Sequence, residues 1–119
     1  MDKIAGYLNL ALRAGKLALG VDNIRAAKHK LYAILADTGL AAGSLERLKR
    51  CAAERKIPLY VFDGQLAELI HKEKCRAAGL ADGNIWNGMR AWIEQAEAFK
   101  PIESMIDDQR RQDGAEALK

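Results

Sequence analysis

The stretch LNLALRAGKLALG, residues 8–20, contains Gly15 and Gly20, where the first predicted helix ends and the second begins. Apolar side chains that lead into it recur at steps of three and four residues, which predicts an amphipathic helix beginning near residue 2. Gly15 ends that helix, since glycine readily adopts the backbone conformations found after a helix C-terminus. Residues 16–19 then predict a very short strand, and Gly20 opens the chain into a second helix. The chain therefore starts as helix, strand, helix, an order typical of α/β proteins.

Helical and strand-like patterns continue to alternate beyond this stretch. The second helix is expected from Val21 to about Lys28, with Asp22 in its first turn, where the helix dipole favours a carboxylate. Ser44 is a candidate N-cap for a third helix, and this helix must end before Pro58. The predicted strands lie near residues 17–19, 31–36, 58–62 and 75–80. Because the connections between them are long enough to hold helices, we expect an α/β fold with a mixed four-stranded sheet between helix layers.

The length of the chain fits one domain, and its composition changes near the C-terminus. At 119 residues, half of them hydrophobic, the chain can bury one core but cannot hold a second full domain. Residues 101–119 contain five acids against three cations and no aromatic residue. We therefore expect a single domain over residues 1–100 and an acidic C-terminal extension, helical near residues 102–106 and disordered beyond about Gln112.

Positive charge is concentrated in the first half of the chain. Residues 1–56 hold eleven Lys and Arg against five Asp and Glu, a balance of +6, whereas the whole chain carries +3. Such a basic half favours a polyanionic partner, because cations that neutralise phosphates release condensed counterions. The N-terminus carries charges at Asp2 and Lys3 without a long apolar run, and no segment has the length of a membrane span. We therefore expect a cytoplasmic protein without membrane contact.

The residue types that carry catalysis or metal binding are few and scattered. Cys51 and Cys75 lie 24 residues apart with no second pair, which indicates neither a disulfide framework nor a zinc site. His71 and Cys75 have the spacing of two metal ligands on a helix, but the sequence offers no obvious further pair. The chain has no Gly-rich phosphate loop, paired carboxylates or nucleophile motif. We therefore expect no enzyme activity, no metal and no cofactor.

Four segments, taken together and in this order, resemble the kink-turn RNA-binding ribosomal-protein superfamily, in particular its small bacterial ribosomal-protein-like members. The segments are LNLALRAGKLALG at 8–20, KLYAILAD at 30–37, LERLKRCAAERKIPLYVF at 45–62 and QLAELIHKEKCRAAGLAD at 65–82. The first is the most specific, because a helix that ends in Arg-Ala-Gly-Lys-Leu before Gly20 is close to a signature of those members. The resemblance covers about residues 1–85 and implies a three-layer α/β/α domain that grips a sharply bent RNA internal loop.

The resemblance further implies an RNA site at the start of the second helix. Gly20 would let the protein backbone approach the RNA backbone closely. Asp22 and Asn23 would accept hydrogen bonds from guanine edges. Cations around Gly20 would hold phosphates, and two loops would cover unstacked bases with apolar surface. The residues expected to contact structured RNA are Arg13, Lys16, Gly20, Asp22, Asn23, Lys28, Lys30, Ala36, Asp37, Phe62 and Gly64.

Three positions differ from the pattern of the RNA-binding relatives. Where those proteins carry Gly-x-Asn-Glu-x-x-Lys, this chain has Asp22, Asn23 and Ala26 in place of Asn, Glu and Lys. Some of the site residues also have a structural interpretation. Asp22 suits the helix dipole without RNA, Asp37 suits a turn or a cap, and the cations suit a solvated face.

A protein-interaction module is the alternative function, because a fold does not determine what a protein binds. The last predicted helix carries Trp86, Met89, Trp92 and Ile93, more apolar side chains than an edge helix needs. Such residues pack in a core or form the surface for a homodimer or another protein.

Overall fold

Helices and strands alternate along residues 2–102, which are the residues that the computed structural model of the protein describes. The elements are α1 (Asp2–Arg13), β1 (Leu17–Leu19), α2 (Val21–Ala26), β2 (Ala33–Asp37), α3 (Ala42–Arg55), β3 (Leu59–Phe62), α4 (Leu66–Ile70), β4 (Ala77–Leu80), α5 (Gly83–Gln95) and β5 (Phe99–Pro101). The prediction of α1 is confirmed, since Ile4, Leu8 and Ala11 are its buried residues. Gly15, with φ at 69°, follows the helix in a backbone conformation that glycine adopts without a steric cost.

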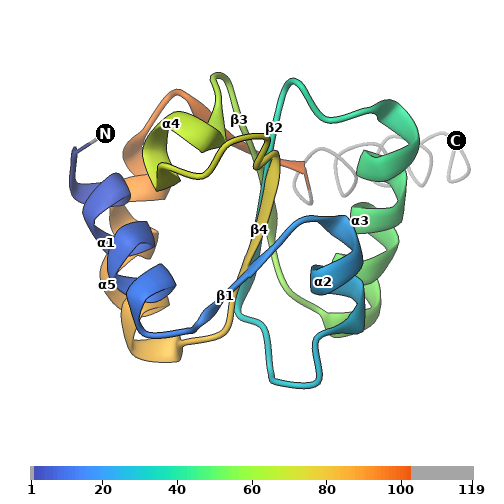
Figure 1. Ribbon diagram of the computed structural model, residues 1–119, viewed down its shortest axis with the longest axis horizontal. Helices are drawn as coiled ribbons and strands as arrows, with labels where there is room; N and C mark the ends of the chain where they lie inside the picture. Colours follow the sequence, from blue (N-terminus) through green and yellow to red (C-terminus); the bar gives the residue numbers. More distant parts are fainter. Residues whose placement is uncertain (1, 103–119) are drawn as a thin grey trace, which may run out of the picture.

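The strands form one mixed sheet in the order β1-β4-β2-β3-β5. Only β2 and β3 run parallel within this sheet of the described residues, with Ile34 opposite Leu59, and the other neighbours are antiparallel. Helices α1, α4 and α5 lie on one side of the sheet, and α2 and α3 lie on the other (Figure 1). The predicted α/β class with a mixed sheet is confirmed, and the ends of the four expected strands are shifted by at most two residues.

The prediction of four strands is corrected by β5, which forms a fifth. Phe99 pairs with Phe62 and Lys100 with Val61, so β5 is an antiparallel edge strand beside β3. A domain boundary after Lys100 would therefore cut this strand, and Ile102 also packs against the core on the α2–α3 side. The expectations of further helix at Met105 and Ile106 and of disorder in the acidic extension concern residues outside the described part of the chain.

Two hydrophobic cores lie on the two sides of the sheet, and β2 contributes to both. Along this strand Ala33 and Leu35 face the core beneath α1, α4 and α5, whereas Ile34 and Ala36 face the core beneath α2 and α3. This alternation follows from the two-residue period of a strand. All five residues of β2 are buried, as expected for a strand with helices on both sides.

Helix α5 packs into the first core through most of its large apolar side chains. Trp86, Met89 and Ile93 are buried there, and Trp86 lies 5.9 Å from Tyr60 between ring centroids. Trp92 is the exposed member of the apolar set, at 44%. Of the two interpretations of these four residues, packing in the core therefore holds for the three that the domain itself covers.

The helix ends differ in part from the sequence-based predictions. Helix α2 stops at Ala26 instead of continuing to Lys28. Helix α3 begins at Ala42 after Ala41, so Ser44 lies inside its first turn and does not cap it. None of the helices in residues 2–102 combines the length and the apolar character needed to cross a membrane.

Candidate nucleic-acid interface

The four cations expected to bind phosphates lie on segments that meet where β4 ends. Here the Ala81 N–H donates to the Lys16 carbonyl, and the Tyr32 N–H donates to the Leu80 carbonyl, both at 2.8 Å. These bonds bring the segments before β1 and before β2 to the same end of the sheet. We call Arg13, Lys16, Lys28 and Lys30 the basic end.

The remaining expected site residues lie at the opposite end of the sheet, where β4 begins. There the Gly20 N–H donates to the Ala77 carbonyl at 2.9 Å, and the Asp37 N–H donates to the Arg76 carbonyl at 3.0 Å. The expectation that the four cations surround Gly20 is thus corrected. Lys16 and Gly20 flank the extended strand β1, which separates their Cα atoms by about 13 Å at roughly 3.3 Å per residue.

All four side chains of the basic end are exposed to solvent. No ion pair joins any of them to a carboxylate within residues 2–102. The Lys30 ammonium lies 5.0 Å from the centroid of the Tyr32 ring, a cation–π arrangement that leaves the ammonium open to a further anion. These cations are therefore free to contact phosphates.

The start of α2 presents hydrogen-bond acceptors. Gly20 has φ at 87° and ψ at 157°, a backbone conformation that only glycine adopts readily, and directs the chain from β1 into the helix. The Asn23 amide donates to the Leu19 carbonyl at 2.7 Å, which leaves its Oδ1 available as an acceptor. Asp22 is exposed beside it. An exposed carboxylate and a fixed amide oxygen are suitable acceptors for the N–H groups of a guanine edge.

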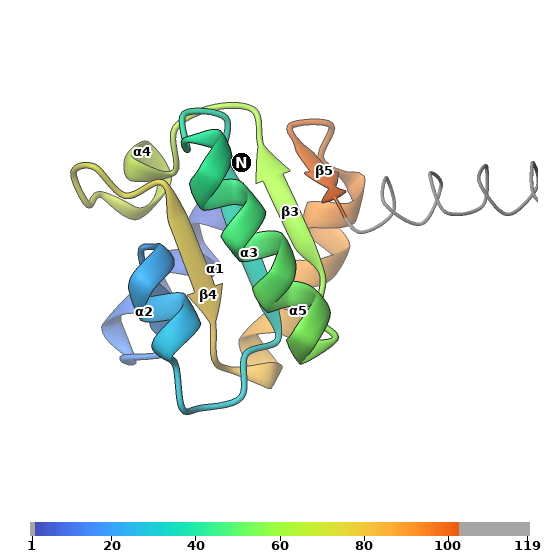
Figure 2. The ribbon, with the colours of Figure 1, turned by 90° about the vertical axis from the view of Figure 1, so that its right-hand side faces the viewer.

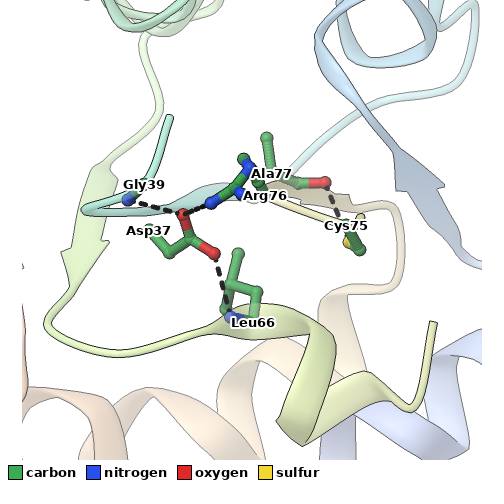
Figure 3. A network of polar contacts seen from close by, with 6 residues as sticks. All are labelled: Asp37, Gly39, Leu66, Cys75, Arg76 and Ala77. Carbon is green, nitrogen blue, oxygen red and sulfur yellow. Dashed lines mark hydrogen bonds and ion pairs between the residues drawn. The ribbon is translucent and has the colours of Figure 1, made fainter. Parts of the chain in front are cut away.

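The carboxylate of Asp37 is used inside the protein instead of at the surface (Figure 3). Its Oδ1 accepts the Gly39 N–H at 2.9 Å, its Oδ2 accepts the Leu66 N–H at 3.0 Å, and the Arg76 guanidinium lies 3.8 Å away. The side chain is 1% exposed. Asp37 therefore joins the end of β2 to the first turn of α4, and its expected role as an RNA contact is corrected to the turn-and-cap role.

Two other residues expected in the flanking loops are also internal. Ala36 is fully buried, and Phe62 is 7% exposed and stacked on Phe99 with ring centroids 4.7 Å apart. Gly64 lies at an intermediate exposure, and a side chain there would collide with the Phe62 ring. Of the residues expected in these two loops, only the Gly64 backbone remains near the surface.

Arg76 is a surface cation at this end of the sheet that sequence analysis placed inside a strand. Its side chain is 52% exposed although its guanidinium approaches Asp37. The guanidinium also lies over Gly39, where an added Cβ would collide with it. In the sequence, Arg76 is recognisable only as a basic residue just before an apolar run. Its contacts Asp37 and Gly39 lie more than thirty residues earlier in the chain.

The Cys75 thiol next to Arg76 is a buried group rather than a reactive one. Desolvation by burial raises the pKa of this thiol, and the negative charge of Asp37 acts in the same direction. The thiol therefore stays protonated near neutral pH, and its Sγ lies 3.5 Å from the Ala77 carbonyl. Residues 2–102 contain no group of three or more His, Cys, Asp and Glu placed to hold a metal ion.

Comparison with known proteins bears on the fold. No family model matches the chain, and no curated protein does. Among solved structures, the chain is similar to a protein of unknown function from Bacillus halodurans, with a TM-score of 0.72 and 20% sequence identity. The match covers 80% of this chain and 100% of that protein. The chain therefore shares its α/β fold with a protein that matches along its entire length.

Proposed function

We propose that this chain is an RNA-binding protein built as a three-layer α/β/α domain, like the kink-turn binders that its sequence resembles. The observation that carries the proposal is the basic end, where four exposed cations on the segments before β1 and before β2 lie at one end of the sheet without acidic partners in residues 2–102. Exposed cations collected in this way bind phosphates and release counterions.

The two groups of residues have different roles in this proposal. The cations of the basic end hold the RNA backbone, which fixes the position of the RNA without reading its sequence. Asp22 and Asn23, at the other end of β1, accept hydrogen bonds from a base edge. Because β1 is an edge strand of the sheet, a folded RNA lying along β1 and α2 reaches both groups.

Replacing Lys16 by alanine is expected to weaken the binding of every structured RNA by a similar factor. The slope of log K against log salt should fall by about one unit, because one phosphate contact is lost. Gel-shift or calorimetric titrations at several salt concentrations measure this slope. Lys100→Ala is the matched control, since it removes one exposed cation from β5 at the opposite edge of the sheet and should leave the slope unchanged.

Replacing Asn23 by alanine is expected to cost about 1–3 kcal/mol in binding, and only for an RNA that presents the matching base edge. Restoring the relatives' residues with Asp22→Asn, Asn23→Glu and Ala26→Lys should raise the affinity for a standard kink-turn RNA. A calorimetric comparison of a kink-turn with a duplex of the same length separates base reading from backbone binding.

The RNA proposal fails if the folded wild-type chain binds no structured RNA at moderate salt and Lys16→Ala has no effect. That result would favour the protein-interaction alternative. The surface left for such a partner is small, because Leu10 and Trp92 are the large hydrophobic side chains exposed among the described residues.

A further inference from the structure

A pocket lined by four arginines lies between α2 and α3, on the side of the sheet opposite to α1, α4 and α5. Its volume is about 450 Å³, within the range of about 300–1,000 Å³ typical of small-molecule sites. Figure 2 shows the two helices side by side on this face. The residues that line the pocket are Arg25, Arg47, Arg50, Cys51, Glu54 and Arg55.

Regular helix spacing places most of the lining on one side of α3. Arg47 and Arg50 are three residues apart, and Glu54 follows four residues after Arg50, so they share a helix face. Arg25 comes from the last turn of α2, across the pocket. The floor is formed by Cys51, which is 8% exposed. The pocket is therefore built from two helices and depends on how they pack.

Arg55 contributes to that packing, beside the buried contact of Ile24 with α3, and acts as a positioning residue. Its guanidinium donates to the Ala27 carbonyl at 2.7 Å and to the Ile24 carbonyl at 3.4 Å. These carbonyls lie at the C-terminal end of α2, where Ala27 is the C-cap residue and its N–H also donates to the Ile24 carbonyl at 3.3 Å. Arg55 thus binds the end of α2 to α3, and Arg25, Arg47 and Arg50 are the other three arginines in the lining.

Those three guanidiniums have no acidic partner in the described part of the chain. No carboxylate of residues 2–102 lies within 4 Å of Arg25, Arg47 or Arg50. Glu54 is the single acid in the lining, so four arginines against one glutamate give the pocket a balance of +3. An anion that entered the pocket would relieve the repulsion among these cations.

We propose that this pocket is a binding site for a phosphate group. A guanidinium presents its N–H groups as a planar fork that matches two phosphate oxygens, and three arginines without acidic partners in residues 2–102 line this one pocket. The lining is polar apart from Cys51, and this polar character disfavours an apolar ligand. The phosphate is carried by a free nucleotide or by an RNA backbone, and either source uses the same three arginines. This phosphate site does not depend on the RNA interface proposed above, since the pocket and the basic end share no residue.

Binding of inorganic phosphate, pyrophosphate and AMP to the full chain tests the site by calorimetry at constant ionic strength, with chloride as the balancing anion. We expect saturable binding of one ligand per chain, tightest for pyrophosphate. Arg47→Ala and Arg50→Ala should each weaken it about tenfold, the effect of losing a charge-assisted hydrogen bond. Both residues are exposed on a helix, where alanine is well tolerated, and a melting curve checks that the variants fold.

The matched control is the double variant Lys16→Ala with Lys28→Ala, which removes the same charge from the basic end. It should retain phosphate binding, whereas Arg47→Ala with Arg50→Ala should lose it. Glu54→Gln should strengthen binding about fivefold, because it removes a like charge beside the anion. Arg47→Lys with Arg50→Lys keeps the charge but loses the forks, and should bind more weakly than the wild type.

Absence of saturable binding overturns the proposal, and so does an equal loss of binding in the arginine and lysine double variants, which would show general charge attraction. RNA titrations then identify the source of the phosphate. If the arginine double variant lowers the salt slope for RNA by about two units, the pocket holds the RNA backbone. If that slope is unchanged while AMP binding is lost, the pocket serves a free phosphate ester. If RNA binding is lost only in the lysine double variant, the RNA contacts lie at the basic end. The phosphate site is then still supported by the loss of AMP binding in the arginine double variant.

Discussion

Replacing Asp37 by alanine is expected to lower the free energy of unfolding by about 3 kcal/mol. The substitution leaves the N–H groups of Gly39 and Leu66 without the carboxylate oxygens that now accept them at 2.9 and 3.0 Å. The Leu66 N–H is buried and costs about 1–3 kcal/mol when left without a partner, whereas Gly39 is exposed and water can replace part of its lost bond. The Arg76 guanidinium loses its partner as well, but it is half exposed and water compensates for most of that loss. Urea denaturation followed by the fluorescence of the buried Trp86 measures the change.

Two other variants identify the cause of this loss. Asp63→Ala removes an exposed carboxylate that makes no side-chain hydrogen bond within residues 2–102, and should change stability by less than about 0.5 kcal/mol. Asp37→Asn keeps one acceptor oxygen but turns an N–H₂ group toward the other donor. Its free energy of unfolding should therefore lie between those of the wild type and of Asp37→Ala. If Asp37→Ala is no more harmful than Asp63→Ala, the carboxylate does not hold α4 to β2.

The parts of the fold that can be predicted from the sequence depend on neighbours along the chain. Helix α1 follows from apolar spacing and from Gly15, and β2 follows from a short apolar run between polar breaks. Strand β5 has the sequence Phe-Lys-Pro, which carries no strand pattern of its own. It becomes a strand because it pairs with the free edge of β3, a long-range contact that three residues do not reveal.

The candidate sites show the same division between local and long-range information. Exposed cations near Gly20 are visible in the sequence, but the length and register of β1 decide that Lys16 lies at the other end of the sheet. The bond from the Gly39 N–H to Asp37 is local and typical of a turn, whereas the bond from Leu66 spans 29 residues.

The arginine pocket required the structure for the same reason. The sequence shows that Arg47 and Arg50 share a face of α3, but it does not show which helix packs beside that face. Arg25 joins them because α2 packs beside α3, where Ile24 lies in the same core as Leu48 and Arg55 donates to the Ala27 carbonyl. The site is thus a property of helix packing and has no motif in the sequence.

Replacing Phe99 by alanine is expected to lower the free energy of unfolding by about 3 kcal/mol, within the usual cost of about 3–5 kcal/mol for a buried phenylalanine. Phe99 is 4% exposed and belongs to the core on the α1–α5 side of the sheet. Its ring stacks on Phe62 with an angle of 21° between the planes, and the two residues are also paired in the register of β3 and β5. The lower end of the range applies because β5 is an edge strand, so the surroundings can close over part of the cavity.

The control for this variant is Lys100→Ala in the same strand. Lys100 is exposed while Phe99 is buried, so the two side chains point to opposite sides of β5. Lys100→Ala should change the unfolding free energy by less than about 0.5 kcal/mol while leaving the pairing with Val61 intact. Equal, small effects of the two substitutions would mean that β5 unfolds separately from the rest of the domain. A large effect of Phe99→Ala alone would show that the cooperative unit extends past residue 98, because the stacked pair then contributes to the core that unfolds as one.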